Sequence, residues 1–381
     1  MWKEERLADI AKFYKGTGIS KDQLSDEGEP CILYGELYTK YKSETIGKVI
    51  SKTNIDNTKL VKSKTNDVII PCSGETAEDI ATARCVLNDN ILLGGDLNII
   101  RLHGYDGTFM SYQLNGKRKY DIARVAQGVS VVHLYGEHLK GVKTINPCLE
   151  EQKKIANLLS LLDERIATQN KIIDKLQSLI KGINQSIFMN NNVINYKLGE
   201  VCGIRSGYSG NQLLSKKGLK VSRIETISGH KVNMERVGYV APFESSENYR
   251  LRVGDILFSN INSVEYIGNT AFIDKDYNLY HGMNLLRLTP NNMVVIPFYL
   301  YLLLNTNRML NRFKTICNKA VSQASINQTE LGKTVVQIPD INAQEQICKF
   351  YQALYDKLES EKYANSLFQK QKQYLLRQMF I

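Results

Sequence analysis

Branched aliphatic residues recur every seven positions in the middle of the chain. They form two rows, four residues apart: Ile155, Leu162, Gln169, Leu176 and Ile183, then Leu159, Ile166, Ile173, Ile180 and Ile187. Nine of these ten positions are aliphatic, which is typical of a coiled-coil seam sustained over about four heptads. Pro147 comes just before the seam, where its missing N–H costs nothing, and Asn190–Asn192 follows it. The pattern predicts a long helix over residues 147–190.

The C-terminal segment repeats this pattern less regularly. Its rows are Ile347, Leu354, Phe368 and Leu375, then Tyr351, Leu358 and Met379, and they are interrupted by Glu361, Asn365 and Lys372. We therefore expect a second long helix over residues 339–381. A helix of about 40 residues is roughly 60 Å long, because each residue adds 1.5 Å. Few small domains offer a face of that length, so pairing of the two helices is favoured over the packing of each helix on its own domain.

The sequence before and within each helix occurs twice. Pro147, Gln152 and Ile155 match Pro339, Gln344 and Ile347 at an offset of 192 residues. Four further pairs of segments precede the helices, and they occur in the same order in both halves. They are Leu7–Ile10 with Leu198–Val201, Asn66–Ile70 with Gly254–Phe258, Gly95–Leu102 with Gly282–Leu288, and Gln127–Val131 with Ser322–Ile326. The third of these matches pairs Arg101 with Arg287. A tandem repeat is predicted, with a globular domain over residues 1–146, a helix over 147–190, a second domain over 191–338 and a second helix over 339–381.

Short β-branched stretches bounded by Gly, Asn, Asp and Pro fill both globular halves. We expect strands at residues 67–71, 97–102, 129–134, 255–259, 270–273 and 334–338. Each half is then a mixed, β-rich domain, and the fold class is α+β. If the two long helices are antiparallel, a pseudo-dyad relates the halves.

Charge is unevenly distributed. The net charge is +10 for the chain, with +7 in residues 191–338 but only +1 in residues 1–146. A basic segment favours a polyanionic partner. The seven cysteines are scattered and never form C-x-x-C, and the most apolar run, residues 293–304, is about half a membrane span. We expect a cytoplasmic protein that has no membrane segment.

Motifs of catalysis are missing from the sequence. It contains no P-loop and no complete dinucleotide-binding fingerprint, and its five histidines form no H-E-x-x-H pair. Asn146-Pro147-Cys148 lacks the second proline and the aromatic residue of the amino-methyltransferase motif. We expect a non-catalytic chain that holds no metal and no cofactor.

The duplicated domain–helix arrangement resembles the specificity subunits of type I restriction-modification systems. The residues that carry the resemblance are Ala123–Leu134 and Pro147–Ile155 in the first half, Leu162–Ile166 in the first helix, and Ser325–Asn327, Leu331, Ile338–Pro339 and Glu345–Ile347 in the second half. The second copy departs from the pattern because Gln344 and Gln346 both compete for one position, which leaves the helix register open.

This resemblance implies two target-recognition domains that read an asymmetric, bipartite site on double-stranded DNA. It also implies an antiparallel coiled coil that separates the domains and docks two methyltransferase subunits, to which restriction (translocase) subunits add. S-adenosylmethionine, ATP and Mg²⁺ would then bind to the partner subunits rather than to this chain.

Candidate contact residues follow from residue type. The DNA-binding candidates are Lys15, Lys117, Arg118, Lys119 and Gln127 in the first half and Arg205, Lys216, Lys217, Lys220, Arg223, Arg250, Arg252, Asn260 and Asn262 in the second. For most of them a phosphate contact, or exposure to solvent without any DNA contact, is favoured over base recognition. Apolar residues of the first helix that lie outside its seam are candidates for subunit docking: Leu158, Leu161, Ile172 and Leu179.

Two other functions stay open at this stage. The chain would be a stand-alone bipartite DNA-binding protein if no enzyme subunit docks on its helices. It would be a methyltransferase if its catalytic residues are dispersed rather than gathered in a motif.

Overall fold

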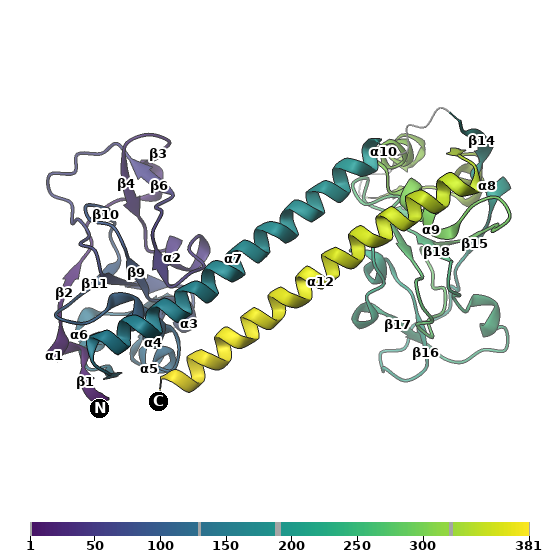
Figure 1. Cartoon of the computed structure of the whole chain (residues 1–381). Coiled ribbons are helices and arrows are strands. Elements are labelled where there is room, and N and C mark those ends of the chain that lie inside the picture. The colour runs from purple at the N-terminus through teal and green to yellow at the C-terminus, as the bar shows by residue number, and fades with distance from the viewer. Residues whose placement is uncertain (1, 129–130, 187–191, 320–322, 381) are drawn as a thin grey trace. The chain divides into compact units, whose positions relative to one another are not determined.

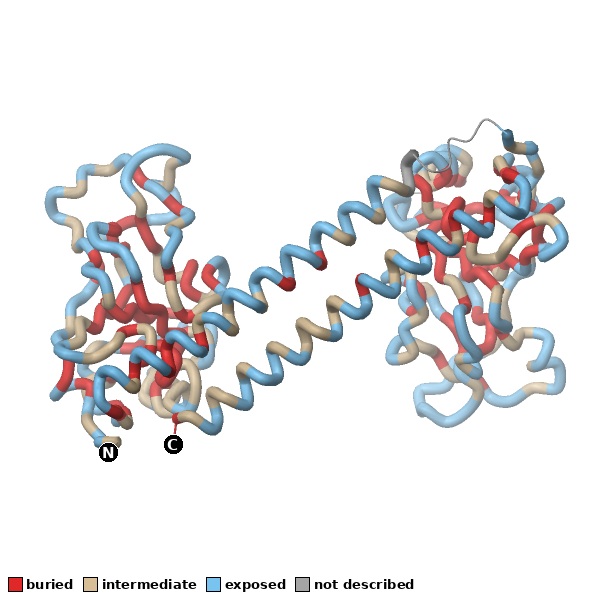
Figure 2. Tube along the Cα trace, in the orientation of Figure 1, coloured by how far each residue is buried: buried red, intermediate tan, exposed pale blue. Residues whose placement is uncertain are grey.

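The computed structural model describes residues 2–128, 131–186, 192–319 and 323–380. The chain divides into two compact units (Figure 1): unit 1 comprises Met1–Ile172 and Glu361–Ile381, and unit 2 comprises Ile173–Ser360. Buried residues concentrate in the sheets of each unit and in the short helices that cover them, whereas the two long helices are mostly exposed (Figure 2). The predicted α+β class is confirmed.

A five-stranded sheet forms the centre of unit 1. Its strand order is β2-β11-β7-β9-β5, with β2 at Ala11–Lys15, β11 at Leu97–Leu102, β7 at Asp67–Pro71, β9 at Arg84–Val86 and β5 at Thr45–Ile46. The two strands predicted at 67–71 and 97–102 are confirmed at the same bounds. Val68 and Ile70 of β7 and Ile100 of β11 are buried in one core, while Ile69 and Ile99 enter a second core on the other face. Two-sided burial explains why these strands have continuous apolar runs.

Smaller sheets and helices complete unit 1. The strand pairs are β1 (Lys3–Arg6) with β13 (Lys143–Asn146) and β8 (Ser73–Gly74) with β12 (Val132–His133). A four-stranded sheet has the order β10-β4-β6-β3, from Leu92–Leu93, Glu29–Ile32, Ser51–Thr53 and Leu24–Ser25. The helices are α1 (Leu7–Ile10), α2 (Glu36–Thr39), α3 (Ala77–Ile80), α4 (Gly107–Asn115), α5 (Lys119–Val125) and α6 (Gly136–Lys140). The strand expected over 129–134 is shorter in the structure, and residues 129–130 lie outside the described ranges.

Unit 2 repeats the central sheet in the same order. The sheet β15-β21-β18-β20 consists of Cys202–Ser206, Leu286–Pro290, Ile256–Phe258 and Thr270–Phe272. The pair β14 (Ile194–Lys197) with β24 (Val335–Ile338) corresponds to β1 with β13, and β19 (Ile261–Asn262) with β23 (Ala324–Ser325) corresponds to β8 with β12. The other elements are α8 (Leu198–Val201), α9 (Pro297–Leu304), α10 (Asn307–Ile316), α11 (Gln328–Gly332), β22 (Asn318–Lys319) and the pair β16 (Leu219–Val221) with β17 (Gly238–Val240). The internal repeat is thus present in the fold as well as in the sequence.

Strand register fixes which residues of the two halves correspond. In unit 1, Ile100 of β11 pairs with Val68 of β7 and with Phe13 of β2. In unit 2, Leu288 of β21 pairs at the corresponding positions of β18 and β15. Leu288 is therefore the counterpart of Ile100.

This register corrects one match made from sequence. The counterpart of Arg101 is Thr289, so the predicted match of Arg101 with Arg287 is wrong by two residues. A shift of two residues keeps every side chain on the same face of a strand, and the hydrophobic pattern alone could not detect it.

The two long helices are α7 (Leu149–Ser186) and α12 (Ile341–Met379). Every predicted seam position from Ile155 to Ile183 on α7, and from Ile347 to Met379 on α12, is buried or half-buried. Ile187 and Asn190, at the expected end of the first helix, lie outside the described residues. The heptad rows therefore identify the buried face of both helices.

Within unit 1 the two helices run antiparallel. The side chain of Gln169 contacts Glu361, the Arg165 guanidinium lies 5.2 Å from the centre of the Phe368 ring, and Asp163 contacts Lys372. Residue numbers fall along α7 as they rise along α12, which defines the direction. In unit 2, Ile180 and Ile183 pack against the core that contains Ile347 and Tyr351.

A buried glutamine joins the start of α7 to the rest of unit 1. Its side-chain oxygen accepts a hydrogen bond from the backbone N–H of Asp106, the N-cap of α4, at 2.9 Å, and its nitrogen donates to the carbonyl of Pro147 at 2.8 Å. This residue, Gln152, is 1% exposed. Both ends of the amide are thus satisfied by backbone groups.

Gln344 joins the start of α12 to the rest of unit 2 in the same way. It accepts from the N–H of Ile296, the N-cap of α9, at 2.8 Å and donates to the carbonyl of Pro339 at 2.9 Å. Gln346 is exposed. The register question left open by the sequence is settled in favour of Gln344 as the counterpart of Gln152.

Candidate nucleic-acid interface

Two of the predicted DNA-binding residues of unit 2 lie in one pocket with a third arginine. The pocket has a volume of about 360 Å³ and is lined by Gly203, Arg205, Glu247, Asn248, Arg252, Arg287 and Thr289. Arg205 and Arg287 face each other directly on β15 and β21. Sequence reasoning missed Arg287, although its place in an alternating strand, with its side chain opposite to the buried Leu286 and Leu288, was a usable signal.

Arg287 is held in one orientation. Its Nε lies 3.4 Å from Asp255 and donates to the Thr289 hydroxyl at 3.2 Å, while its Nη1 donates to the carbonyl of Arg250 at 3.1 Å. The side chain is only 12% exposed. By contrast, Arg205 and Arg252 are exposed, and neither makes an ion pair with any residue that the structure describes.

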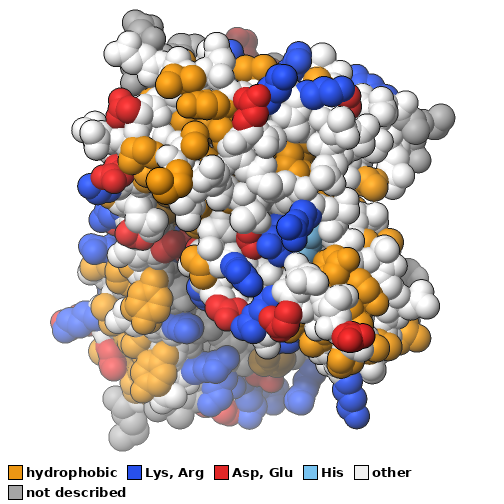
Figure 3. Space-filling model, turned by 90° about the vertical axis from the view of Figure 1, so that its right-hand side faces the viewer, with side chains coloured by type: hydrophobic (Ala, Val, Ile, Leu, Met, Phe, Trp, Pro, Cys, Tyr) orange, Lys and Arg blue, Asp and Glu red, His pale blue; other side chains and the backbone are white. Residues whose placement is uncertain are grey.

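The other candidates of unit 2 are in different surroundings. Arg223 pairs with Glu225 and lines another hollow, and Arg250 pairs with Asp276. Lys216 and Lys217 are exposed just before β16, and Lys220 is exposed within it. Figure 3 shows Lys and Arg side chains gathered across the middle and lower parts of the face it presents, with acidic side chains between them.

The two candidate asparagines follow β18. Asn262 uses its amide locally, donating to Ser259 at 3.1 Å and accepting from the N–H of Ser263 at 2.8 Å. Asn260 donates to the carbonyl of Ile326 at 3.4 Å, while its side-chain oxygen is buried without a hydrogen-bond partner. Asn260 therefore has the freer acceptor of the two.

The candidates of unit 1 are in two places. Lys15 ends β2 opposite Asn98, whose amide donates to the carbonyl of Leu134, and Gln127 exchanges backbone hydrogen bonds with the neighbouring His133. Lys15 and Gln127 are thus connected through Asn98 and the segment His133–Leu134. Residues 117–119 lie at the other end of α5, where Arg118 pairs with Asp121 and Lys117 is exposed.

Unit 1 has no equivalent of the arginine pocket at the matching place among its described residues. Arg101 makes a two-pronged ion pair with Asp67 at 2.7 and 2.8 Å, and its guanidinium lies 4.8 Å from the centre of the Tyr14 ring. Tyr14 occupies the position that Arg205 has in unit 2. The single arginine is therefore neutralised and covered.

The four docking candidates are all exposed at the surface of α7. Their exposed fractions are 49% for Leu158, 54% for Leu161, 38% for Ile172 and 48% for Leu179. Leu161 and Ile172 line a groove of about 550 Å³ together with Glu164, Arg165, Thr168, Gln169 and Glu361. The groove lies within unit 1, along the line where α7 and α12 meet.

Polar residues that interrupt the seam of α12 have polar partners in unit 1. The ammonium of Lys372 lies 2.6 Å from carboxylates of both Asp163 and Glu44, and the Asn365 amide donates to Asn170 at 2.9 Å. Burial is the main cause that raises the pKa of Glu44, with the Asp163 charge adding to it and Lys372 opposing it. Charged groups are tolerated at this seam because they are paired.

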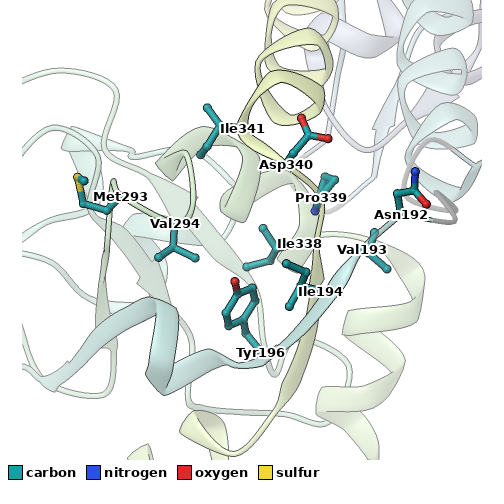
Figure 4. A pocket seen from close by; sticks show the side chains of 10 residues that line it. All are labelled: Asn192, Val193, Ile194, Tyr196, Met293, Val294, Ile338, Pro339, Asp340 and Ile341. Atoms are coloured by element: carbon teal, nitrogen blue, oxygen red, sulfur yellow. The ribbon is translucent and has the colours of Figure 1, made fainter.

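A hollow lined mainly by apolar side chains lies at the start of α12 (Figure 4). It has a volume of about 710 Å³, and its lining includes Ile194, Tyr196, Val294 and Ile338. The one carboxylate among its lining residues, Asp340, accepts a hydrogen bond from the N–H of Ala343 at 2.9 Å and so caps the helix. Nothing in this lining forms an acid–base pair.

Among the described residues, no three His, Cys, Asp or Glu side chains come together as metal ligands. His281 is buried, and its desolvation lowers the pKa of the imidazole to about 4. No helix in the described ranges has the length and apolar character needed to cross a membrane.

Comparison with known proteins gives one consistent family. A family model described as the type I restriction modification DNA specificity domain matches residues 1–178 and again residues 190–366. A Methanocaldococcus jannaschii protein named as the MjaX specificity subunit of a type I restriction enzyme is 44% identical over 149 residues, which are 38% of this chain and 35% of that protein. The MjaVIII specificity subunit of the same organism is 26% identical over 68% of this chain and 63% of its own length. The alignment thus covers about a third of the length of the first relative and somewhat under two thirds of the length of the second.

The fold of the whole chain also has a known counterpart. The crystal structure of a type I restriction-modification S subunit from M. genitalium superposes with a TM-score of 0.64, at 18% identity, over 100% of this chain and 96% of that one. A structure described under complex assembly of the type I restriction-modification system gives a TM-score of 0.61, at 16% identity, over 98% and 96%. At these identities the likeness establishes the fold.

Proposed function

Because the chain belongs to the type I restriction-modification DNA specificity family, we propose that it recognises a bipartite, asymmetric DNA site and carries no catalytic centre of its own. The observation that supports this most is the repeat of one sheet topology in two units whose added segments differ. A duplicated scaffold suits two half-sites on duplex DNA, and different added segments suit two different half-site sequences.

Each globular half is proposed as one target-recognition domain, residues 1–146 and 191–338, and the helices at 147–190 and 339–381 as the separating coiled coil. The four-stranded sheet β10-β4-β6-β3 is added in unit 1, and the β16–β17 pair is added in unit 2. In unit 2 the added segments hold Lys216, Lys217, Lys220 and Arg223. The domain at residues 191–338 carries the larger positive charge.

Docking of enzyme subunits on the helices is the second part of the proposal. Two methyltransferase subunits would pack on the exposed apolar residues of α7, with restriction subunits joining the assembly. S-adenosylmethionine, ATP and Mg²⁺ would bind on those partners. The groove beside Leu161 and Ile172 supports this, since an exposed apolar strip on a paired helix is a usual place for a further helix.

Methylation mapping tests DNA recognition. The methylated motifs of the host genome are compared before and after deletion of the gene for this chain. We expect one motif to disappear, composed of two short specified parts separated by an unspecified spacer. A motif that persists unchanged, or one without a spacer, would contradict the proposal.

Charge substitutions in the groove test docking. Leu161→Glu with Ile172→Glu should abolish co-purification of the methyltransferase subunits, because carboxylates would be buried without partners. The control is Gln177→Glu with Ser178→Glu, which adds the same charge at exposed polar positions of α7. Equal recovery of partner subunits with both variants would mean that they dock elsewhere on the chain, whereas no recovery even with the wild-type chain would favour the stand-alone DNA-binding protein.

The methyltransferase alternative has its own test. The purified chain, shown free of other subunits, should neither bind S-adenosylmethionine in calorimetry nor transfer a methyl group to DNA. Methyl transfer by such a preparation would overturn the assignment of a non-catalytic subunit.

A further inference from the structure

Resting on the proposed function, we infer that Arg205, Arg252 and Arg287 form a clamp for one phosphodiester of the DNA backbone, and that only unit 2 has it. The clamp is the pocket of about 360 Å³ between β15, β21 and the segment before β18.

The positive charges that line this pocket favour the binding of an anion. Arg205 and Arg287 stand directly opposite each other on adjacent antiparallel strands, and like charges at such positions are destabilising. Asp255, which lies outside the lining, offsets Arg287 alone, and the one carboxylate in the lining, Glu247, accepts a hydrogen bond from the Tyr280 hydroxyl at 3.3 Å. The positive charges of Arg205 and Arg252 have no carboxylate partner among the described residues.

Arg287 is the side chain of the clamp that is held in a fixed orientation. Its Nε and Nη1 are engaged by Thr289, Asp255 and backbone carbonyls, while its Nη2 donates to no described residue. A guanidinium anchored along one edge offers its remaining hydrogens in a fixed direction. Arg205 and Arg252, being exposed and unpaired, are able to close on a bound oxyanion from either side.

A phosphodiester fits this pocket better than a base edge. Three guanidiniums supply donors only, and a phosphate offers acceptor oxygens together with a full negative charge. A guanine edge accepts one bidentate arginine but carries no charge, so the positive charges of Arg205 and Arg252 would stay uncompensated. A phosphate contact positions the duplex and carries no sequence information.

The matching place in unit 1 is built differently. Tyr14 replaces Arg205 and Ile99 replaces Arg287 in the structural register, and Arg101 is neutralised by Asp67. The matching place in unit 1 thus lacks the facing pair of arginines.

The test is DNA binding by the full chain as a function of salt. Arg205→Gln with Arg252→Gln is measured by fluorescence anisotropy on a duplex that contains the mapped motif and on a scrambled duplex. Each lost phosphate contact reduces the slope of log affinity against log salt by about 0.9. We expect a slope shallower by about 1 and affinity lower by roughly tenfold on both duplexes, so that discrimination is unchanged.

Two matched variants complete the experiment. Arg205→Lys with Arg252→Lys retains the point charges and should restore the slope. Lys171→Gln with Lys175→Gln removes the same charge from exposed positions of α7 and should leave the slope at the wild-type value.

The outcomes separate this inference from the proposed function. A wild-type chain that prefers neither duplex contradicts the proposed function and the clamp with it. If the wild type discriminates but the Gln variant keeps its slope, the clamp alone is wrong. Loss of discrimination at one base pair with an unchanged slope would identify the arginines as base-reading residues instead.

Discussion

The ammonium of Lys372 on α12 lies 2.6 Å from the carboxylate of Asp163 on α7. Glu44 of unit 1 reaches the same ammonium at 2.6 Å, and the Tyr112 hydroxyl donates to Asp163 at 2.7 Å. All three charged side chains are nearly buried. This ion network ties the end of the second helix both to the first helix and to the globular part of unit 1.

Lys372→Met should therefore destabilise unit 1. The variant leaves Asp163 and Glu44 as buried carboxylates without their cation, and breaking such a pair costs about 3–5 kcal/mol. Trp2 is the only tryptophan of the chain and packs beside Phe109 in unit 1, so its fluorescence in a urea titration reports on this unit. Lys370→Met, at an exposed position of the same helix, is the control and should change the free energy of unfolding by less than about 0.5 kcal/mol.

The raised pKa of Glu44 makes a prediction about pH. The folded state holds the Glu44 proton at a pH where the unfolded state, with its ordinary pKa of 4.5, has released it. The associated stability is complete below 4.5 and is lost as the pH rises through the folded pKa. Glu44→Gln cannot lose a proton, so its urea midpoint relative to the wild type should rise between pH 4.5 and 8. Arg84 also faces this site and is unchanged in both proteins.

The control for Glu44→Gln is Glu29→Gln, a neutral substitution at an exposed carboxylate. The difference between this variant and the wild type should be flat with pH over the same interval. A flat difference for Glu44→Gln as well would show that burial does not govern the ionisation of Glu44.

Gln344 and Gln346 offer a matched pair in unit 2. Gln344→Ala leaves the N–H of Ile296 and the carbonyl of Pro339 without their partner, and an unsatisfied buried polar group costs about 1–3 kcal/mol. Gln346→Ala alters an exposed side chain and should be within about 0.5 kcal/mol of the wild type. Urea unfolding followed by circular dichroism distinguishes them. Equal stability of the two variants would mean that the hydrogen bonds of Gln344 do not stabilise the packing of α12 against α9.

The long helices make a prediction about the spacer of the proposed DNA site. Insertion of one heptad into both α7 and α12 keeps each seam in phase and lengthens each helix by about 10 Å. That length is close to three base pairs at 3.4 Å each. If the helices set the separation of the half-sites, the methylated motif should gain about three unspecified base pairs while both specified parts stay the same.

Insertion into α7 alone is the control, and it should disrupt the pairing of the helices and prevent assembly. The readout is methylation of a DNA library with varied spacers by the reconstituted complex. An unchanged spacer preference in the double insertion would restrict the helices to a docking role.

The sequence by itself determined the architecture. Heptad rows identified the buried faces of α7 and α12, because a side chain that recurs every 3.5 residues stays on one side of a helix. The strands at 67–71 and 97–102 were equally predictable, since their apolar runs between turn residues are local signals. The repeat was visible because the copies keep the same buried positions.

Only the tertiary structure decided which polar groups meet. The sequence marked Glu361, Asn365 and Lys372 as interruptions of a seam, but their partners Gln169, Asn170 and Asp163 lie about 190 to 210 residues away in the chain. Local patterns also could not tell Gln344 from Gln346, or detect that Arg101 corresponds to Thr289. The arginine pocket was invisible for the same reason: hydrophobic periodicity specifies the face on which a side chain lies, whereas cross-strand register, which depends on the packing of the whole sheet, specifies its neighbours.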